Sequence, residues 1–344
     1  MDKKFRDFLI NFNKFKNKHL WSGCFHEDSN CSQRIIKAHS IQNNKILNKI
    51  SENGEVLMFG AVGGNDYGIT TDLQEKGRKK ATTFTGFCGH HDHSIFRPIE
   101  NYDYIPGNAE QEFLFTYRAT AKEYHAKKSS ANMYRTLLDL LDKGSYTAIS
   151  SSFEAGPPSE EHIHYMKELY SRALFGTQDA EKRLERYRQK LNTDLENMFY
   201  DDIITNVIVL GEEYHIAVSS ATFLEENLNG TKINDLGDFS ISLAPLFITV
   251  FPQNGQTFIL LSHFKRNDRR YRFIKEDLLK RDTREIKMIL SNIILSHVEN
   301  LVVSPKRWRE TKLSTRNKIT KLFNKNTKEV NNPLIIDYNL DLFL

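Results

Sequence analysis

The sequence is poor in cysteine, with only three among its 344 residues. So small and odd a number does not support a disulfide framework, and it favours a reducing, cytoplasmic environment. Long apolar runs are also lacking, since the longest stretches, such as "APLFITVF", are far too short to cross a bilayer. The N-terminus is interrupted by charge throughout and does not have the pattern of a signal peptide. We therefore expect neither a membrane span nor a disulfide-rich secreted domain.

Sequence signatures of several enzyme classes are missing as well. The chain contains no glycine-rich phosphate-binding loop, no dinucleotide-binding fingerprint and no Ser-His-Asp order. Its 39% hydrophobic and 27% charged residues are typical of a globular protein, and its formal net charge is +4. This mildly basic balance permits a nucleic-acid partner without requiring one.

All three cysteines, Cys24, Cys31 and Cys88, lie within the first 88 residues of the chain. Structural zinc is usually held by two close pairs of nitrogen or sulfur donors, because a short turn can aim two donors at one point. Cys24 and Cys31 form the first pair, and Cys88 with His91 forms the second. The spacing therefore predicts a structural Zn²⁺ site with three thiolates and one imidazole.

Two alternatives to this ligand set stay open. His26, His90 or His93 could replace His91, because each lies near one of the donor pairs. In the second alternative the cysteines are small buried hydrophobic residues, and the histidines belong to a solvated turn.

Short segments with different patterns separate the two donor pairs. Residues 34–41 ("RIIKAHSI") and 53–60 ("NGEVLMFG") predict strands, the second entered through an Asn53-Gly54 turn. Residues 42–50 between them predict a short helix or turn. A hydrophilic segment follows at 63–80, and a helix is expected to begin near Cys88.

A knuckle, a hairpin and a helix in this order resemble a treble-clef zinc finger, and more narrowly the HNH nuclease family. The segments "AHSIQ" and "TFTGFCGHHDHSIFRPIE" also resemble a group of uncharacterised bacterial proteins that share both. The resemblance covers residues 20–100. It implies a strand histidine that acts as general base and a divalent metal that stabilises the phosphorane.

His39 matches the position of that base. The resemblance implies Asp92 as a ligand of catalytic Mg²⁺ or Mn²⁺ and Asn43 or Asn44 as the orienting asparagine. Ala38 departs from the family pattern, because it stands where a metal-binding neighbour usually lies. A zinc finger without the chemistry, in which His39 is a buried hydrogen-bonded residue, is the alternative.

The rest of the chain predicts helices followed by an antiparallel sheet. Helices are expected at 110–128, 133–143, 159–175 and 177–199, with an Asn108 cap and a stop at Gly176. From residue 201 the period becomes that of strands, with a hairpin at Asn254-Gly255, and helices are expected at 283–298 and 304–323. The fold class is α+β. The predicted units are an HNH-like treble clef at 1–105, a helical region at 106–200 and an α+β domain with basic C-terminal helices at 201–344.

Two basic segments, residues 76–80 and 306–328, predict a nucleic-acid partner, although each could instead be a solvated basic surface. The candidate contacts are Arg78, Lys79, Lys80, Arg307 and Arg309. The predicted function is a zinc-containing, HNH-like nucleic-acid-binding protein that acts on DNA or RNA as a metal-dependent nuclease if it is an active enzyme. The alternative is a non-catalytic scaffold with a structural zinc finger, which binds a protein partner or a second copy of the chain.

Overall fold

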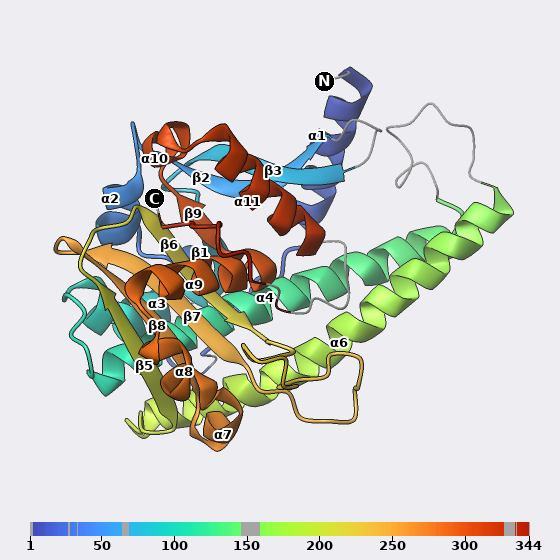
Figure 1. Ribbon diagram of the computed structural model, residues 1–344. Coiled ribbons are helices and arrows are strands. Elements are labelled where there is room, and N and C mark those ends of the chain that lie inside the picture. The colour runs from blue at the N-terminus through green and yellow to red at the C-terminus, as the bar shows by residue number, and fades with distance from the viewer. Residues whose placement is uncertain are drawn as a thin grey trace.

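The computed structural model describes residues 3–26, 28–32, 34–63, 69–145, 159–326, 334 and 336–343. A seven-stranded antiparallel sheet forms its centre, and helices cover both faces of the sheet (Figure 1). A two-stranded sheet lies beside it and belongs to the N-terminal part of the chain. The described chain is therefore a mixed α+β fold, as the sequence predicts.

The large sheet has the strand order β3-β2-β9-β6-β7-β8-β5, and every neighbouring pair in it is antiparallel. Its strands are β2 (Glu55–Gly63), β3 (Ile69–Gly77), β5 (Ile203–Leu210), β6 (Ile216–Thr222), β7 (Leu246–Gln253), β8 (Gln256–Phe264) and β9 (Leu301–Val303). The sheet thus takes strands from both ends of the sequence, on either side of the boundaries expected at residues 105 and 200.

Apolar side chains on the central strands point alternately to the two faces of the sheet, which explains why helices cover both faces. In β7, Ile248 and Val250 belong to one hydrophobic core, whereas Phe247 and Phe251 belong to cores on the opposite face. Helix α9 (Thr283–His297) packs into the first core, and helix α4 (Ala109–Asp142) into the second. Burial on both faces goes with the nearly continuous apolar sequence of β7 from Leu246 to Phe251.

Two long helices form an antiparallel pair that extends beyond the sheet (Figure 1). They are α4 and α6 (Glu160–Glu196). The other helical elements are α1 (Lys3–Lys18), η1 (Asn43–Leu47), α2 (Asn48–Ile50), α3 (Gly89–Glu100), η2 (Lys265–Asn267), α7 (Asp268–Tyr271), α8 (Phe273–Glu276), η3 (Leu278–Lys280), α10 (Pro305–Glu310) and α11 (Leu313–Asn326). No helix in the described part of the chain combines the length and the apolar character that a membrane span requires.

The small sheet pairs β1 (Ile35–His39) with β4 (Thr83–Cys88), and α3 follows β4 without a gap. Aromatic residues bury this unit against α4: Phe25, Phe87 and Tyr117 are fully buried and contact one another edge-on or tilted. The β1-β4-α3 unit is therefore packed firmly on the first half of α4.

Local signals in the sequence predicted several of these features correctly. Asn108 caps α4 by accepting a hydrogen bond from the Gln111 backbone N–H at 3.0 Å. Asn254 and Gly255 have φ of 52° and 79° and form the β7–β8 turn, while Asn53 and Gly54 have φ of 52° and 80° before β2. Positive φ at both central residues is the conformation that a tight hairpin requires.

Within the hydrophilic segment at 63–80, residues 69–77 form strand β3, which the sequence pattern did not predict. Residues 64–68 of that segment lie outside the described residues. Strand β3 pairs with β2 along its full length, from Glu55 opposite Gly77 to Gly63 opposite Ile69. It is the edge strand of the sheet, and charged residues there oppose further strand addition. A polar edge strand lacks the apolar run by which buried strands are recognised.

Three helix boundaries were also wrong. Helix α6 continues through Gly176, and α4 is one helix instead of two. The predicted helix at 304–323 is broken at Thr311 and Lys312 into α10 and α11. Gly176 is tolerated because a single glycine inside a long packed helix costs only about 1 kcal/mol relative to alanine.

Candidate metal centre and the neighbouring histidine

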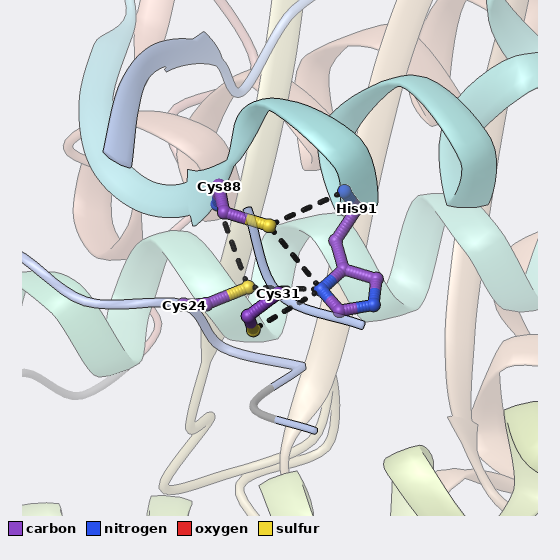
Figure 2. A group of neighbouring side chains, drawn as sticks. All are labelled: Cys24, Cys31, Cys88 and His91. Atoms are coloured by element: carbon purple, nitrogen blue, oxygen red, sulfur yellow. Dashed lines mark hydrogen bonds between the residues drawn. The ribbon is translucent and has the colours of Figure 1, made fainter. Parts of the chain in front are cut away.

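Three sulfur atoms and one imidazole nitrogen converge at the start of α3 (Figure 2). The Sγ atoms of Cys24, Cys31 and Cys88 each lie 3.4 Å from Nδ1 of His91. Cys88 is the residue before α3, and its sulfur accepts a hydrogen bond from the His91 backbone N–H at 3.4 Å. The turn from β4 into α3 therefore places Cys88 and His91 side by side, and the loop before β1 supplies the other two.

The spacing of these donors fits a four-coordinate metal ion. In a tetrahedral site with bonds of about 2.3 Å to sulfur and about 2.0–2.1 Å to nitrogen, the sulfur and nitrogen atoms lie about 3.5 Å apart. The three sulfur–nitrogen distances of 3.4 Å are close to that value. Cys24, Cys88 and His91 are buried, which is typical of a closed structural site rather than one with an open position.

The electrostatics of the cluster favour a bound cation. Burial, with the neighbouring Cys88 and Cys31, raises the pKa of the Cys24 thiol to about 12. Burial also opposes ionisation of Cys88, but hydrogen bonds from His91 and Ser32 lower its pKa overall. Three thiolates crowded together repel one another, and a divalent cation would offset that repulsion. The cluster can therefore hold a metal ion.

Asp28 is part of this centre, although no pattern in the sequence singled it out. Its Oδ1 lies 3.2 Å from Nε2 of His91, on the side of the ring opposite the sulfurs. The Asn30 backbone N–H donates to Asp28 at 2.7 Å and fixes the carboxylate in the knuckle, the loop between Cys24 and Cys31. A carboxylate on the distal nitrogen orients a metal-binding imidazole and leaves Nδ1 free to bind the metal.

Cys24, Cys31, Cys88 and His91 form a Cys/His quartet, and the other histidines near it are not part of it. His90 and His93 are exposed, and neither belongs to a group of donors that could hold a metal among the described residues. His26 is buried, with its Nδ1 3.2 Å from the Tyr117 hydroxyl and its Nε2 3.8 Å from Asp28. His26 with Asp28 and His91 forms a second, overlapping group of possible ligands, so it is the nearest rival.

His39 is the last residue of β1 and is half-buried. Its Nδ1 lies 3.4 Å from Oγ1 of Thr82, a buried residue with φ of 58°. A positive φ is unfavourable for a β-branched residue and is often found at functional sites. Burial lowers the pKa of His39 below its ordinary value, so the imidazole is neutral at neutral pH.

Asp92 is half-buried on α3, and burial raises the pKa of its carboxyl group, with a further rise from Glu100. Arg118 opposes that rise; its guanidinium pairs with Glu100 at 2.7 Å and lies 4.0 Å from the centroid of Phe96. Glu100 and Arg118 also influence the pKa of His39, so this ion pair is close to both residues. Within the described residues, His39 and Asp92 belong to no cluster of metal ligands.

Asn43 and Asn44 begin the short helix after β1. The Asn43 side chain accepts a hydrogen bond from Nη1 of Arg78 at 3.0 Å, and its amide donates to Asn44 at 3.1 Å. Asn43 therefore positions Arg78, whose charge is close enough to lower the pKa of His39. No hydrogen bond between Asn43 and His39 occurs in the described residues.

The two basic segments meet at one turn of the chain. The Arg78 backbone N–H donates to Gly54 O at 2.9 Å, while Arg309 donates to both carboxylate oxygens of Glu52 at 2.6 Å. Arg307 pairs with Glu310 at 3.2 Å. Lys79 and Lys80 are exposed, and neither makes an ion pair with a described residue. Arg307 and Arg309 are thus partly neutralised, whereas Lys79 and Lys80 keep their full charge.

Comparisons of the chain with protein-family models, with curated proteins and with solved structures found no match.

Proposed function

We propose that this protein is a zinc-containing, HNH-like nucleic-acid-binding protein whose N-terminal unit cleaves phosphodiester bonds. The observation that carries the proposal is the position of His39 relative to the Cys/His quartet. The quartet joins the loop before β1 to the start of α3, and β1 and β4 pair so that His39 lies opposite Thr83. A half-buried strand histidine thus lies within a unit that the metal holds together.

Zinc is the ion proposed for the quartet. Three thiolates and one imidazole are soft and intermediate donors, which select zinc over calcium or magnesium. Cys24, Cys31, Cys88 and His91 would bind it, and Asp28 would hold the His91 ring. Its role is structural, because all four positions are filled by protein.

His39 is proposed as the general base. A neutral imidazole can accept a proton from the attacking water, and the lowered pKa of His39 keeps it neutral at working pH. Arg118 and Arg78 lie close enough to perturb His39 and carry the positive charge that a phosphorane needs. Asp92 would supply an oxygen to Mg²⁺ or Mn²⁺, whose chemistry is to stabilise the leaving oxygen.

Exposed cations support a nucleic acid as the substrate. Lys79 and Lys80 precede β4 and therefore lie next to the strand that pairs with His39. Each phosphate that they neutralise would add a salt-sensitive increment of affinity. DNA and RNA share this backbone chemistry, so both belong in the test.

The decisive experiment is cleavage of plasmid DNA and of RNA with Mg²⁺ or Mn²⁺, comparing the unmodified protein with His39→Ala. We expect His39→Ala and Asp92→Ala to abolish hydrolysis while metal content by elemental analysis stays unchanged. His90→Ala is the matched control, because His90 is an exposed histidine of the same unit. Cleavage that persists in His39→Ala, or that is absent from the unmodified protein under all conditions, would refute the catalytic part of the proposal.

A non-catalytic scaffold is the second candidate. It is favoured by the fact that His39 and Asp92 belong to no ligand cluster among the described residues, and by the neutralisation of Arg309 through Glu52. In this case the metal only stabilises the N-terminal unit, and the protein binds a protein partner or a second copy of itself. Absence of nucleic-acid binding at low salt, with full metal content, would identify this class.

A further inference from the structure

A cavity of about 940 Å³ lies between the two long helices and the sheet, and the proposed function does not use it. Residues of α4 and α6 form its walls, and Ser219 and Ser220 of β6 contribute polar groups. Small residues on the helices, including Ala126, Ala173 and Gly176, leave the space between them. Its volume lies within the range of sites that bind small organic molecules.

The charges that line this cavity are not balanced. Lys127 pairs with Glu123 at 3.0 Å, and Arg183 pairs with Asp179 at 2.5 Å. Lys122 and Lys16 also line the cavity, but neither forms an ion pair with a described carboxylate. Arg172 pairs with Glu168, and Glu299 is the one other acid among the described lining residues. The lining therefore carries more positive than negative charge.

Lys122 is the cation of the lining on which the argument for a ligand depends. It is half-buried on α4, and its Nζ lies 5.6 Å from the centroid of the Phe84 ring. Burial lowers the pKa of Lys122, and the positive charges of Lys76 and Lys16 lower it further, against the opposing effect of Glu123 and Glu299. Burial has the largest effect on this ammonium group, and an anion bound next to it would stabilise its charged form.

Large apolar side chains make up another part of the lining. Phe59, Phe223, Leu236, Phe239 and Leu243 face this space. His297 also lines it, and burial lowers its pKa to about 4, so its imidazole adds no charge at neutral pH. The cavity therefore combines one cationic end with an extended apolar surface.

We infer that this cavity binds a small organic anion, with a carboxylate or another acidic group on Lys122 and an apolar body against the aromatic side chains. The inference does not depend on hydrolysis or on the metal centre. It assigns a ligand site in the half of the protein that has no other assigned role.

The probe is anilinonaphthalene sulfonate, which carries one negative charge on an aromatic body, measured by its fluorescence with the full-length protein. We expect one saturable site per chain, displaced by octanoate but not by octylamine. Lys122→Met should weaken binding roughly tenfold or more, because it removes a hydrogen bond between charged groups. Lys167→Met is the matched control, since Lys167 is on α6 and pairs with Asp142 outside the cavity.

A second variant tests the cavity itself with Lys122 intact. A Cβ added at Gly176 meets nothing within 4 Å, so the side chain of Gly176→Phe starts in open space on the cavity wall. It should abolish probe binding while thermal unfolding shows a folded protein. Unchanged binding in Lys122→Met or in Gly176→Phe, or equal displacement by octylamine, would overturn the inference.

Discussion

Asp28 Oδ1 lies 3.2 Å from His91 Nε2, while His91 Nδ1 faces three cysteine sulfurs at 3.4 Å. One imidazole thus links the quartet to a carboxylate in the knuckle. The contact fixes which nitrogen of His91 faces the sulfurs, and it gives the exposed Asp28 a role in orienting that ring.

Replacing Asp28 should weaken metal retention without removing a ligand. We expect Asp28→Asn to lower metal affinity by about 10- to 100-fold, the usual effect of removing such an outer partner. Competition with a coloured chelator measures this. Asp72→Asn, at an exposed position on β3, is the control and should match the unmodified protein. Equal affinities for both variants would mean that Asp28 does not support the site.

Loss of a ligand should have a larger and more local effect. We expect Cys88→Ala to lose most of its metal, because three donors remain where four are needed. Elemental analysis measures the metal, and hydrogen exchange measures the structure. Exchange should accelerate at residues 20–42 and 83–100, whereas β5 to β8 should stay protected, since they belong to the central core. Full retention of metal by Cys88→Ala would show that the ligand assignment is wrong.

Under the proposed function, hydrolysis should depend on the protonation of His39. Burial lowers the pKa of His39, so the neutral base persists to a pH below the ordinary pKa of histidine. Activity should therefore hold as pH falls through the ordinary pKa of histidine, and decline only below it, as His39 becomes protonated. The pH profile of kcat/KM checks this, and a profile that starts to decline well above the ordinary pKa of histidine would contradict it.

Stability should fall on acidification because His125 is buried in its neutral form. Its Nε2 accepts a hydrogen bond from the Thr85 backbone N–H at 3.4 Å, and burial lowers its pKa to about 4. The unfolded chain binds the proton more readily, so stability decreases as pH falls below the unfolded pKa of about 6.5. Between about pH 7.5 and pH 5 this histidine should account for a decrease of about 2 kcal/mol in the free energy of unfolding.

Urea unfolding of His125→Phe isolates that contribution, because phenylalanine keeps a ring in contact with Trp21 and Phe84. The decrease in unfolding free energy from high to low pH should be smaller in this variant than in the unmodified protein. His297 has a similarly low pKa, of about 4, and remains in both proteins. An identical decrease in both would show that His125 does not titrate as described.

Nucleic-acid binding should depend on the exposed lysines more than on the paired arginines. We expect Lys79→Glu with Lys80→Glu to weaken binding strongly and to reduce the salt slope by about two, one for each phosphate that is no longer neutralised. Arg307→Gln and Arg309→Gln should have smaller effects, because both arginines already pair with acids. Lys143→Glu, at the exposed residue that follows α4, is the control. Affinity that is insensitive to all of these substitutions would favour the scaffold.

The Cys/His quartet was predictable because its members are rare residue types with short spacings. Three cysteines within the first 88 residues, with Cys88 and His91 separated by two residues, are enough to predict two donor pairs. Asp28 was not predictable in this way, since it is one of many acidic residues and only the folded knuckle brings it to His91. Its position between the first two cysteines was the only available signal.

The sequence by itself determined the α+β class, the tight turns at Asn53-Gly54 and Asn254-Gly255, and the composition of the quartet, because each depends on local conformation or on near neighbours in the chain. Only the tertiary structure decided that β3 is a polar edge strand, that Asn43 holds Arg78, and that the β1-β4-α3 unit is seated on α4. It also decided that Lys122 lies at the end of a cavity without a described acidic partner. These features depend on contacts between residues far apart in sequence, and the free energy of such contacts comes from burial and charge that no local pattern encodes.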